Sequence, residues 1–170
     1  MLEDAQYILD KVIGQITGYE NQMTVEEFQT KYAFDIKLPS LVKDTTTGED
    51  AWAQSTNPTQ FITHENALKR AAIDDYMLPK IPLANVNEVL SAWQKINYAG
   101  ASRHVESEHI FESDNVNSSQ YVYRSSDVYG AKYVLLCEGA YRSEYVVATQ
   151  RAGECTYCAR VEDSRFCSDS

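Results

Sequence analysis

The chain has 170 residues, of which 44% are hydrophobic, and its formal net charge is −10 at pH 7. This length suffices for one domain or two small ones, and the apolar content is ordinary for a folded protein, so we expect a folded chain. The acidic balance disfavours nucleic-acid phosphates and acidic membrane surfaces as partners, and no apolar run approaches the roughly 20 residues of a membrane span. The N-terminal stretch lacks the pattern of a secretory signal, so we expect the protein to be made in a cytoplasm.

The first part of the chain predicts two helices. Residues 3–16 carry apolar side chains at helical spacing. These residues include Tyr7, Ile8, Val12 and Ile16. The stretch from Thr24 to Glu27 has the spacing of a capping box, in which each side chain accepts a backbone N–H of the other residue. We therefore expect a second, short helix over residues 25–32.

A hairpin and a third helix are expected next. Residues 40–54 contain two short strand-like segments around a turn at Thr47 and Gly48, which predicts a β-hairpin. Residues 60–77 have helical spacing and are followed by a proline. The side chains expected to point inward are Phe61, Leu68, Ala72 and Tyr76.

The last element before the repeats is a fourth helix. A second capping-box pattern, from Asn85 to Glu88, predicts a helix over residues 86–97. Residues 97–102 are expected to form the junction between this N-terminal region and the repeats. Residues 1–98 are thus predicted to form a small helical docking domain with one hairpin, which either caps the following domain or is draped along it.

Residues 103–168 divide into eleven six-residue units with no insertion. The second position of each unit is mostly small or β-branched, and the fifth position is always small. The fifth positions are Ser107, Ser113, Ser119, Ser125, Ala131, Cys137, Ser143, Thr149, Cys155, Val161 and Cys167. Such regularity indicates a repeat architecture.

A parallel β-solenoid explains this repeat best. A three-residue spacing would drift around an α-helix, and a polyproline-type helix requires prolines or regular glycines that this stretch lacks. In a solenoid, small side chains stack inside, and each coil pairs with the next at about 4.8 Å. The predicted fold class is therefore α+β, with a helical N-terminal region and a β-solenoid over residues 99–170.

The spacings leave the coil size open between twelve and eighteen residues. Four tyrosines recur every twelve residues, and three arginines recur every eighteen. We favour twelve, because tyrosines stack well between adjacent strands. The eighteen-residue recurrence of the arginines is also explained if they simply lie on a solvent-exposed face. Both columns are taken as a candidate interface or stacking face: Tyr121, Tyr133, Tyr145, Tyr157, Arg124, Arg142 and Arg160.

The repeat resembles β-solenoid repeats with hexapeptide-type spacing. It departs from acyltransferase hexapeptides, in which a small residue follows an aliphatic one four places later, because the gap here is three, as between Val122 and Ser125. It is similar in spacing to twelve-residue antifreeze-type solenoids, which imply outward ranks of threonine that are missing here. The preferred resemblance is to solenoid stalks of phage and bacterial surface proteins, which implies a structural role.

All four cysteines lie in the repeats, at Cys137, Cys155, Cys158 and Cys167. Their positions in the small inward register favour buried thiols. The pair Cys155 and Cys158 is a weak candidate for a metal site. Cys155 and Cys167, one twelve-residue coil apart, are also near enough for a disulfide. We expect no cofactor.

The sequence offers little for catalysis. It contains no phosphate loop, dinucleotide fingerprint or nucleophile elbow. His104 and His109 lie among glutamates at the start of the repeats, where a surface cluster is the simplest interpretation. We therefore expect no enzyme. The enzymatic alternative is a hexapeptide-type transferase with a site between subunits, for which His109 is the candidate residue.

The favoured function is a non-enzymatic structural or interaction protein that acts as a subunit of a larger assembly. The repeats continue in register to the last residue of the sequence, which predicts an uncapped solenoid end. Either the natural polypeptide continues, or other chains or copies of this chain close this end. A virion component is the most concrete form of this hypothesis. The alternative is a carbohydrate- or metal-binding solenoid module.

Overall fold

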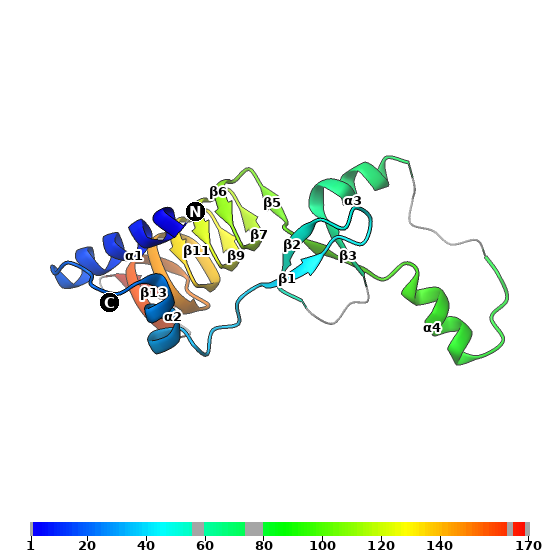
Figure 1. Cartoon of the computed structure of the whole chain (residues 1–170), viewed down its shortest axis with the longest axis horizontal. Helices are drawn as coiled ribbons and strands as arrows, with labels where there is room; N and C mark the ends of the chain where they lie inside the picture. The colour runs from blue at the N-terminus through cyan, green and yellow to red at the C-terminus, as the bar shows by residue number, and fades with distance from the viewer. Residues whose placement is uncertain (1, 56–59, 74–79, 163–164, 169–170) are drawn as a thin grey trace.

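The computed structural model describes residues 2–55, 60–73, 80–162 and 165–168. Figure 1 shows an elongated molecule, with a solenoid at one end and an arm that projects from it. The arm is defined as the described residues from β1 to β4. The elements before the solenoid are α1 (Leu2–Thr17), α2 (Val25–Tyr32), β1 (Ser40–Lys43), β2 (Asp50–Ala53), β3 (Gln60–Thr63), α3 (His64–Ala71), α4 (Val86–Gln94) and β4 (Tyr98–Ala101).

The solenoid has about five coils, each of twelve residues. Val122 pairs with Val134 and Val134 with Val146, always in parallel, so the β-solenoid and the favoured coil size are both confirmed. Its strands are β5 (His104–Val105), β6 (Glu108–Phe111), β7 (Asp114–Asn117), β8 (Gln120–Tyr123), β9 (Ser126–Tyr129), β10 (Lys132–Leu135), β11 (Glu138–Gln150), β12 (Glu154–Glu162) and β13 (Phe166–Ser168).

The coils build two sheets. The first sheet consists of β6, β8, β10 and the second halves of β11 and β12. The second sheet consists of β5, β7, β9, the first halves of β11 and β12, and β13. Because β11 and β12 are long enough to run through both sheets, they join them into one structure.

Left-handed backbone at every third residue produces the three-residue period. Asn115 and Ser118 have φ angles of 55° and 47°, and the same conformation recurs at non-glycine residues along the solenoid. The residue after each of them points inward, as buried Val116 and Ser119 do. A left-handed residue with a side chain costs about 1–2 kcal/mol. The contacts between coils must therefore offset a repeated local cost.

A ladder of hydroxyl groups runs along each edge of the core. The Ser125 hydroxyl donates to the Tyr123 carbonyl at 2.8 Å and accepts the Cys137 N–H, one coil further on, at 3.0 Å. Ser113 accepts the Ser125 N–H in the same way. On the opposite edge, the Ser107 hydroxyl accepts the Ser119 N–H and the Ser119 hydroxyl accepts the Ala131 N–H, both at 3.1 Å. The small fifth position thus fills the core and also satisfies backbone groups that the strands leave unpaired.

Helices α1 and α2 are draped along the solenoid. Ile8, Leu9 and Val12 of α1 are buried against the first sheet, where they meet Leu135 and Val147. The two predicted N-terminal helices are confirmed, as is the capping box that begins α2. The division of the chain into domains at residue 98 stays a prediction.

The helix predicted over residues 60–77 is wrong at its start. The first four of these residues form β3, which pairs in parallel with β4, and α3 covers only eight residues. Of the expected inward side chains, Phe61 is half-buried, whereas Leu68 and Ala72 are exposed. Tyr76 lies outside the described residues. The predicted junction also contains β4, so the sequence pattern predicted neither strand of this pair.

The predicted hairpin is confirmed, and a buried carboxylate attaches it to β3 and α3. Asp44 accepts the N–H groups of Thr46 at 2.7 Å and Thr63 at 2.8 Å, and the side-chain amide of Asn66 at 2.9 Å. Burial on its own would raise the pKa of Asp44, but these hydrogen bonds outweigh it and lower the pKa. The charged form therefore holds the hairpin, β3 and α3 together.

A second buried carboxylate joins the arm to the solenoid. Asp114 accepts the guanidinium of Arg103 at 2.8 Å and the backbone N–H of Gln54 at 3.0 Å. Its side chain is fully buried, whereas that of Arg103 is partly exposed. This pair fixes the hairpin against the first coils of the solenoid.

The hydroxyl ladder predicts opposite outcomes for two neighbouring buried serines. Ser125→Ala should lower the free energy of unfolding by about 1–3 kcal/mol, because it leaves the Cys137 N–H unsatisfied. Ser126→Ala should be neutral or slightly stabilising, because the Ser126 hydroxyl finds no partner among the described residues. Urea unfolding followed by circular dichroism measures both. Equal losses in the two variants would contradict the ladder.

The Asp44 cluster predicts a pH-dependent stability of the arm. A lowered pKa in the folded state contributes stability above the unfolded pKa of about 3.9, and this stability is lost as the pH falls. At pH 7, Asp44→Asn should cost about 2 kcal/mol and speed exchange of the Thr46 and Thr63 amides about 30-fold. The difference from wild type should shrink at pH 3. Hydrogen exchange by NMR, with both proteins at the same pH, checks this prediction.

Candidate functional site

The predicted tyrosine ladder is present on the first sheet. Tyr121 and Tyr133 stack with ring centroids 5.0 Å apart, and Tyr133 and Tyr145 stack at 5.3 Å. Tyr157 continues the ladder. Helix α1 contacts it, since the Lys11 ammonium lies 4.5 Å from the Tyr133 ring centroid. The ladder thus binds a helix of its own chain, and a role at an interface with other chains stays a prediction.

The arginine column divides between the two edges of the solenoid, because eighteen residues make one and a half coils. Arg160 forms two hydrogen bonds with the Asp35 carboxylate, at 2.6 and 2.7 Å, which lower the pKa of Asp35. Arg124 binds Glu112 at 2.7 Å and Gln29 at 2.8 Å. Both arginines therefore fasten the α2 segment to the solenoid.

The two histidines near the start of the repeats have separate environments. His104 hydrogen-bonds the Ser113 carbonyl at 2.9 Å. The His109 ring is parallel to Tyr121 with centroids 4.6 Å apart, so it extends the tyrosine ladder. This stacking gives His109 a packing role, and its catalytic role stays a prediction.

Three cysteines have described side chains, and all three are buried: Cys137, Cys155 and Cys158. Cys155 also pairs in register with Cys167 of the next coil. Within the described ranges, no group of three or more His, Cys, Asp or Glu side chains is arranged to hold a metal ion. The inward cysteine register is confirmed for these three residues.

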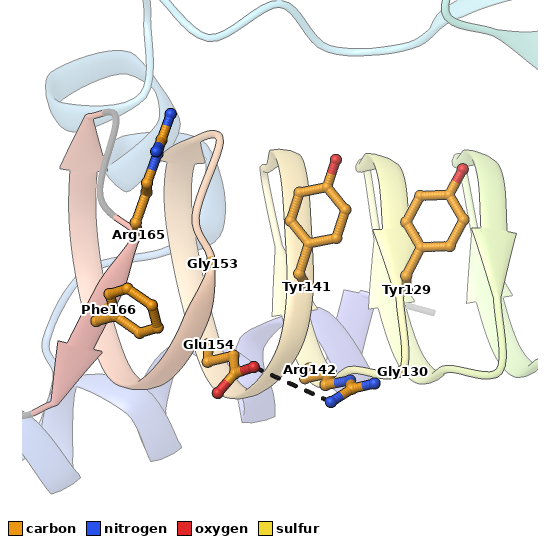
Figure 2. A pocket seen from close by; sticks show the side chains of 8 residues that line it. All are labelled: Tyr129, Gly130, Tyr141, Arg142, Gly153, Glu154, Arg165 and Phe166. Atoms are coloured by element: carbon orange, nitrogen blue, oxygen red, sulfur yellow. Dashed lines mark ion pairs between the residues drawn. The ribbon is translucent and has the colours of Figure 1, made fainter.

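A cleft on the second sheet was missed by the sequence analysis. It has a volume of about 490 Å³ and is lined by Tyr129, Gly130, Tyr141, Arg142, Gly153, Glu154, Arg165 and Phe166. Tyr129 and Tyr141 stack with centroids 5.7 Å apart and an interplanar angle of 9°. Figure 2 shows both rings pointing the same way from successive coils. The cleft opens beside Tyr141, where this second rank of tyrosines stops.

The rank stops because of two features of the next coil. Gly153, twelve residues after Tyr141, has no side chain, and Glu154 turns towards Arg142 at 4.0 Å (Figure 2). The register between β11 and β12 also shifts here, so Tyr141 pairs with Glu154. The twelve-residue spacing of Tyr129 and Tyr141 was visible in the sequence, but the orientation of Glu154 was not.

Helix α4 exposes a stripe of large apolar side chains. The apolar stripe consists of Val86, Val89, Leu90 and Trp93 of the helix and Ile96 just beyond its end, which are 37% to 70% exposed. Only half of the expected capping box is present: Asn85 accepts the Glu88 N–H at 3.1 Å, whereas the Glu88 carboxylate accepts the Ala84 N–H at 2.8 Å. The predicted fourth helix is therefore confirmed, although it ends at Gln94. Figure 1 shows α4 near the end of the arm, away from the solenoid.

Comparisons with family models, curated proteins and solved structures found no match to this chain. No helix in the described ranges combines the length and apolar content that crossing a membrane requires. The functional argument therefore rests on two surfaces, the apolar stripe of α4 and the cleft of the second sheet.

The buried cysteine register predicts protection from alkylation. Burial raises the pKa of the Cys137 thiol to about 11, so very little reactive thiolate forms at pH 8. Iodoacetamide should leave Cys137 unmodified in the native protein and modify it fully in urea, as peptide mass spectrometry would detect. Equal modification in both samples would show that the core is open.

Proposed function

We propose that the protein is a non-enzymatic structural subunit that assembles with copies of itself through the apolar stripe of α4. The observation that carries this proposal is the exposure of four large apolar side chains on one face of a projecting helix, and of Ile96 just after its end. An isolated helix shorter than about 12 residues is marginal in water, and α4 has nine. A contiguous exposed apolar face is typical of an interaction surface.

A second copy suits this surface because uncharged residues flank the stripe. At 100° per residue, Asn87, Ala92 and Gln94 lie beside it, whereas Glu88 and Lys95 fall on the opposite face. Each copy carries a net charge of −10, so self-association favours a contact that contains no carboxylates.

The stripe is also complementary to itself. Antiparallel pairing about a two-fold axis near Ser91 would place Leu90 of one copy against Trp93 of the other, and Val86 against Ile96. One helix face buries less than the roughly 800 Å² per partner of a stable complex. The exposed side chains of Ile81 and Leu83 do not extend the stripe, because they lie beside Glu88 and Lys95 on the other side of α4. We therefore expect a dimer that depends on concentration.

A virion component is the most concrete form of this proposal. It rests on the resemblance of the repeat to solenoid stalks, in which a rigid stack of coils acts as a spacer. The arm would then provide the contact between subunits.

The proposal predicts that Leu90→Glu abolishes self-association. Light scattering should show the mass of the wild-type protein rising from 19.3 kDa towards twice that value. The rise should occur between about 10 µM and 1 mM, the concentrations at which a weak complex forms. Leu90→Glu should stay monomeric, because it buries a charge in the contact. Tyr19→Glu, which makes the same charge change at another exposed site, should behave as wild type. A wild-type protein that stays monomeric at 1 mM would contradict the proposal.

A further inference from the structure

We propose that the cleft of the second sheet binds one ring of an acidic sugar, a pyranose that carries a carboxylate. The free face of Tyr141 would hold the ring, and Arg165 would bind the carboxylate. This site is separate from the apolar stripe of α4 and does not depend on the proposed assembly.

The first argument is the size of the gap beside Tyr141. Figure 2 shows the Arg165 side chain pointing the same way as Tyr141, with Gly153 between them. Two coil steps separate Tyr141 from Arg165, which is roughly 10 Å. One ring inserted there would stack on Tyr141 at the spacing that Tyr129 already uses, 5.7 Å. The gap thus has the width of one missing ring in the rank.

The gap is fixed by the backbone. A Cβ atom added to Gly153 would lie 2.1 Å from the Arg165 carbonyl oxygen, so no other residue fits at this position. A tyrosine of the chain itself therefore cannot complete the rank. The side chain of Glu154, which pairs with Tyr141 in register, turns away towards Arg142.

The second argument is charge. Two guanidinium groups and one carboxylate line the cleft, which gives it a local charge of +1 on a protein of net charge −10. The contact between Arg142 and Glu154 is long, at 4.0 Å, and the Arg142 side chain is 81% exposed. Figure 2 shows Arg142 beside Glu154 and directed away from the Tyr141 ring, whereas Arg165 points the same way as that ring. Arg165 is therefore the arginine placed to bind a carboxylate, and paired N–H groups of arginine match carboxylate geometry. The cleft favours an anionic ligand.

The third argument is the openness of the cleft. Tyr141 is 49% exposed and Phe166 is 85% exposed, so a bound ligand keeps one edge in water. A wholly apolar ring would gain little in such a site. A pyranose has a C–H face that suits an aromatic ring and a hydroxyl-bearing edge that stays hydrated.

Calorimetric titration of the full chain with hexagalacturonate tests the proposal, and maltohexaose is the neutral comparison. We expect binding of the acidic hexamer, at least tenfold weaker binding of the neutral one, and a loss of affinity as salt rises. Tyr141→Ala should weaken binding at least tenfold, and Tyr141→Phe less than threefold. Tyr19→Ala, a substitution of an exposed tyrosine elsewhere, should have no effect.

Two further variants test the role of the arginine in the cleft and the independence of the cleft from the proposed assembly. Arg165→Gln changes an exposed side chain without threatening the fold, and it should weaken binding of the acidic hexamer several-fold and reduce the salt dependence. The variant Leu90→Glu should bind as wild type does, so failure of the assembly proposal leaves this test intact. Absence of wild-type binding at millimolar hexagalacturonate, equal binding of maltohexaose, or unchanged affinity in Arg165→Gln would overturn the proposal.

Discussion

Every coil of the solenoid depends on a small side chain that points inward directly after a left-handed residue. The left-handed backbone turns the chain every three residues, and only a small or β-branched side chain fits into the narrow core that results. The local cost of this backbone is about 1–2 kcal/mol for each non-glycine residue. It is offset between coils, by parallel strand pairing, stacked apolar residues and hydroxyl rungs such as Ser125.

Because of this constraint, the spacing of residues in the sequence determines which side chains are neighbours on the solenoid surface. Residues twelve apart lie above one another, so a repeated tyrosine becomes a stacked rank. The rank that contains Tyr133 lies under α1, which joins the N-terminal region to the solenoid. The rank that contains Tyr141 ends at a glycine and leaves a cleft. The same rule thus builds a structural contact on one sheet and a candidate ligand site on the other.

Much of the fold was predictable because its signals are local. The repeat, the twelve-residue coil, the N-caps at Thr24 and Asn85 and the hairpin can all be read from short spacings. Strand β3 was mistaken for a helix because its partner, β4, is distant in sequence, and four residues carry little periodicity. The cleft was missed for a related reason, since it depends on a shifted register and on the direction in which Glu154 turns. The roles of Arg124 and Arg160 depend on residues more than 90 positions away.

Concentration-dependent hydrogen exchange tests most directly whether the arm is an assembly element. If α4 is stabilised by a second copy, protection of the Leu90 and Trp93 amides rises with protein concentration. Protection in β8 and β10 of the solenoid should stay constant, because their hydrogen bonds lie within one chain. Protection of α4 that is the same at low and high concentration would contradict the account, because the helix would then be stable without a partner.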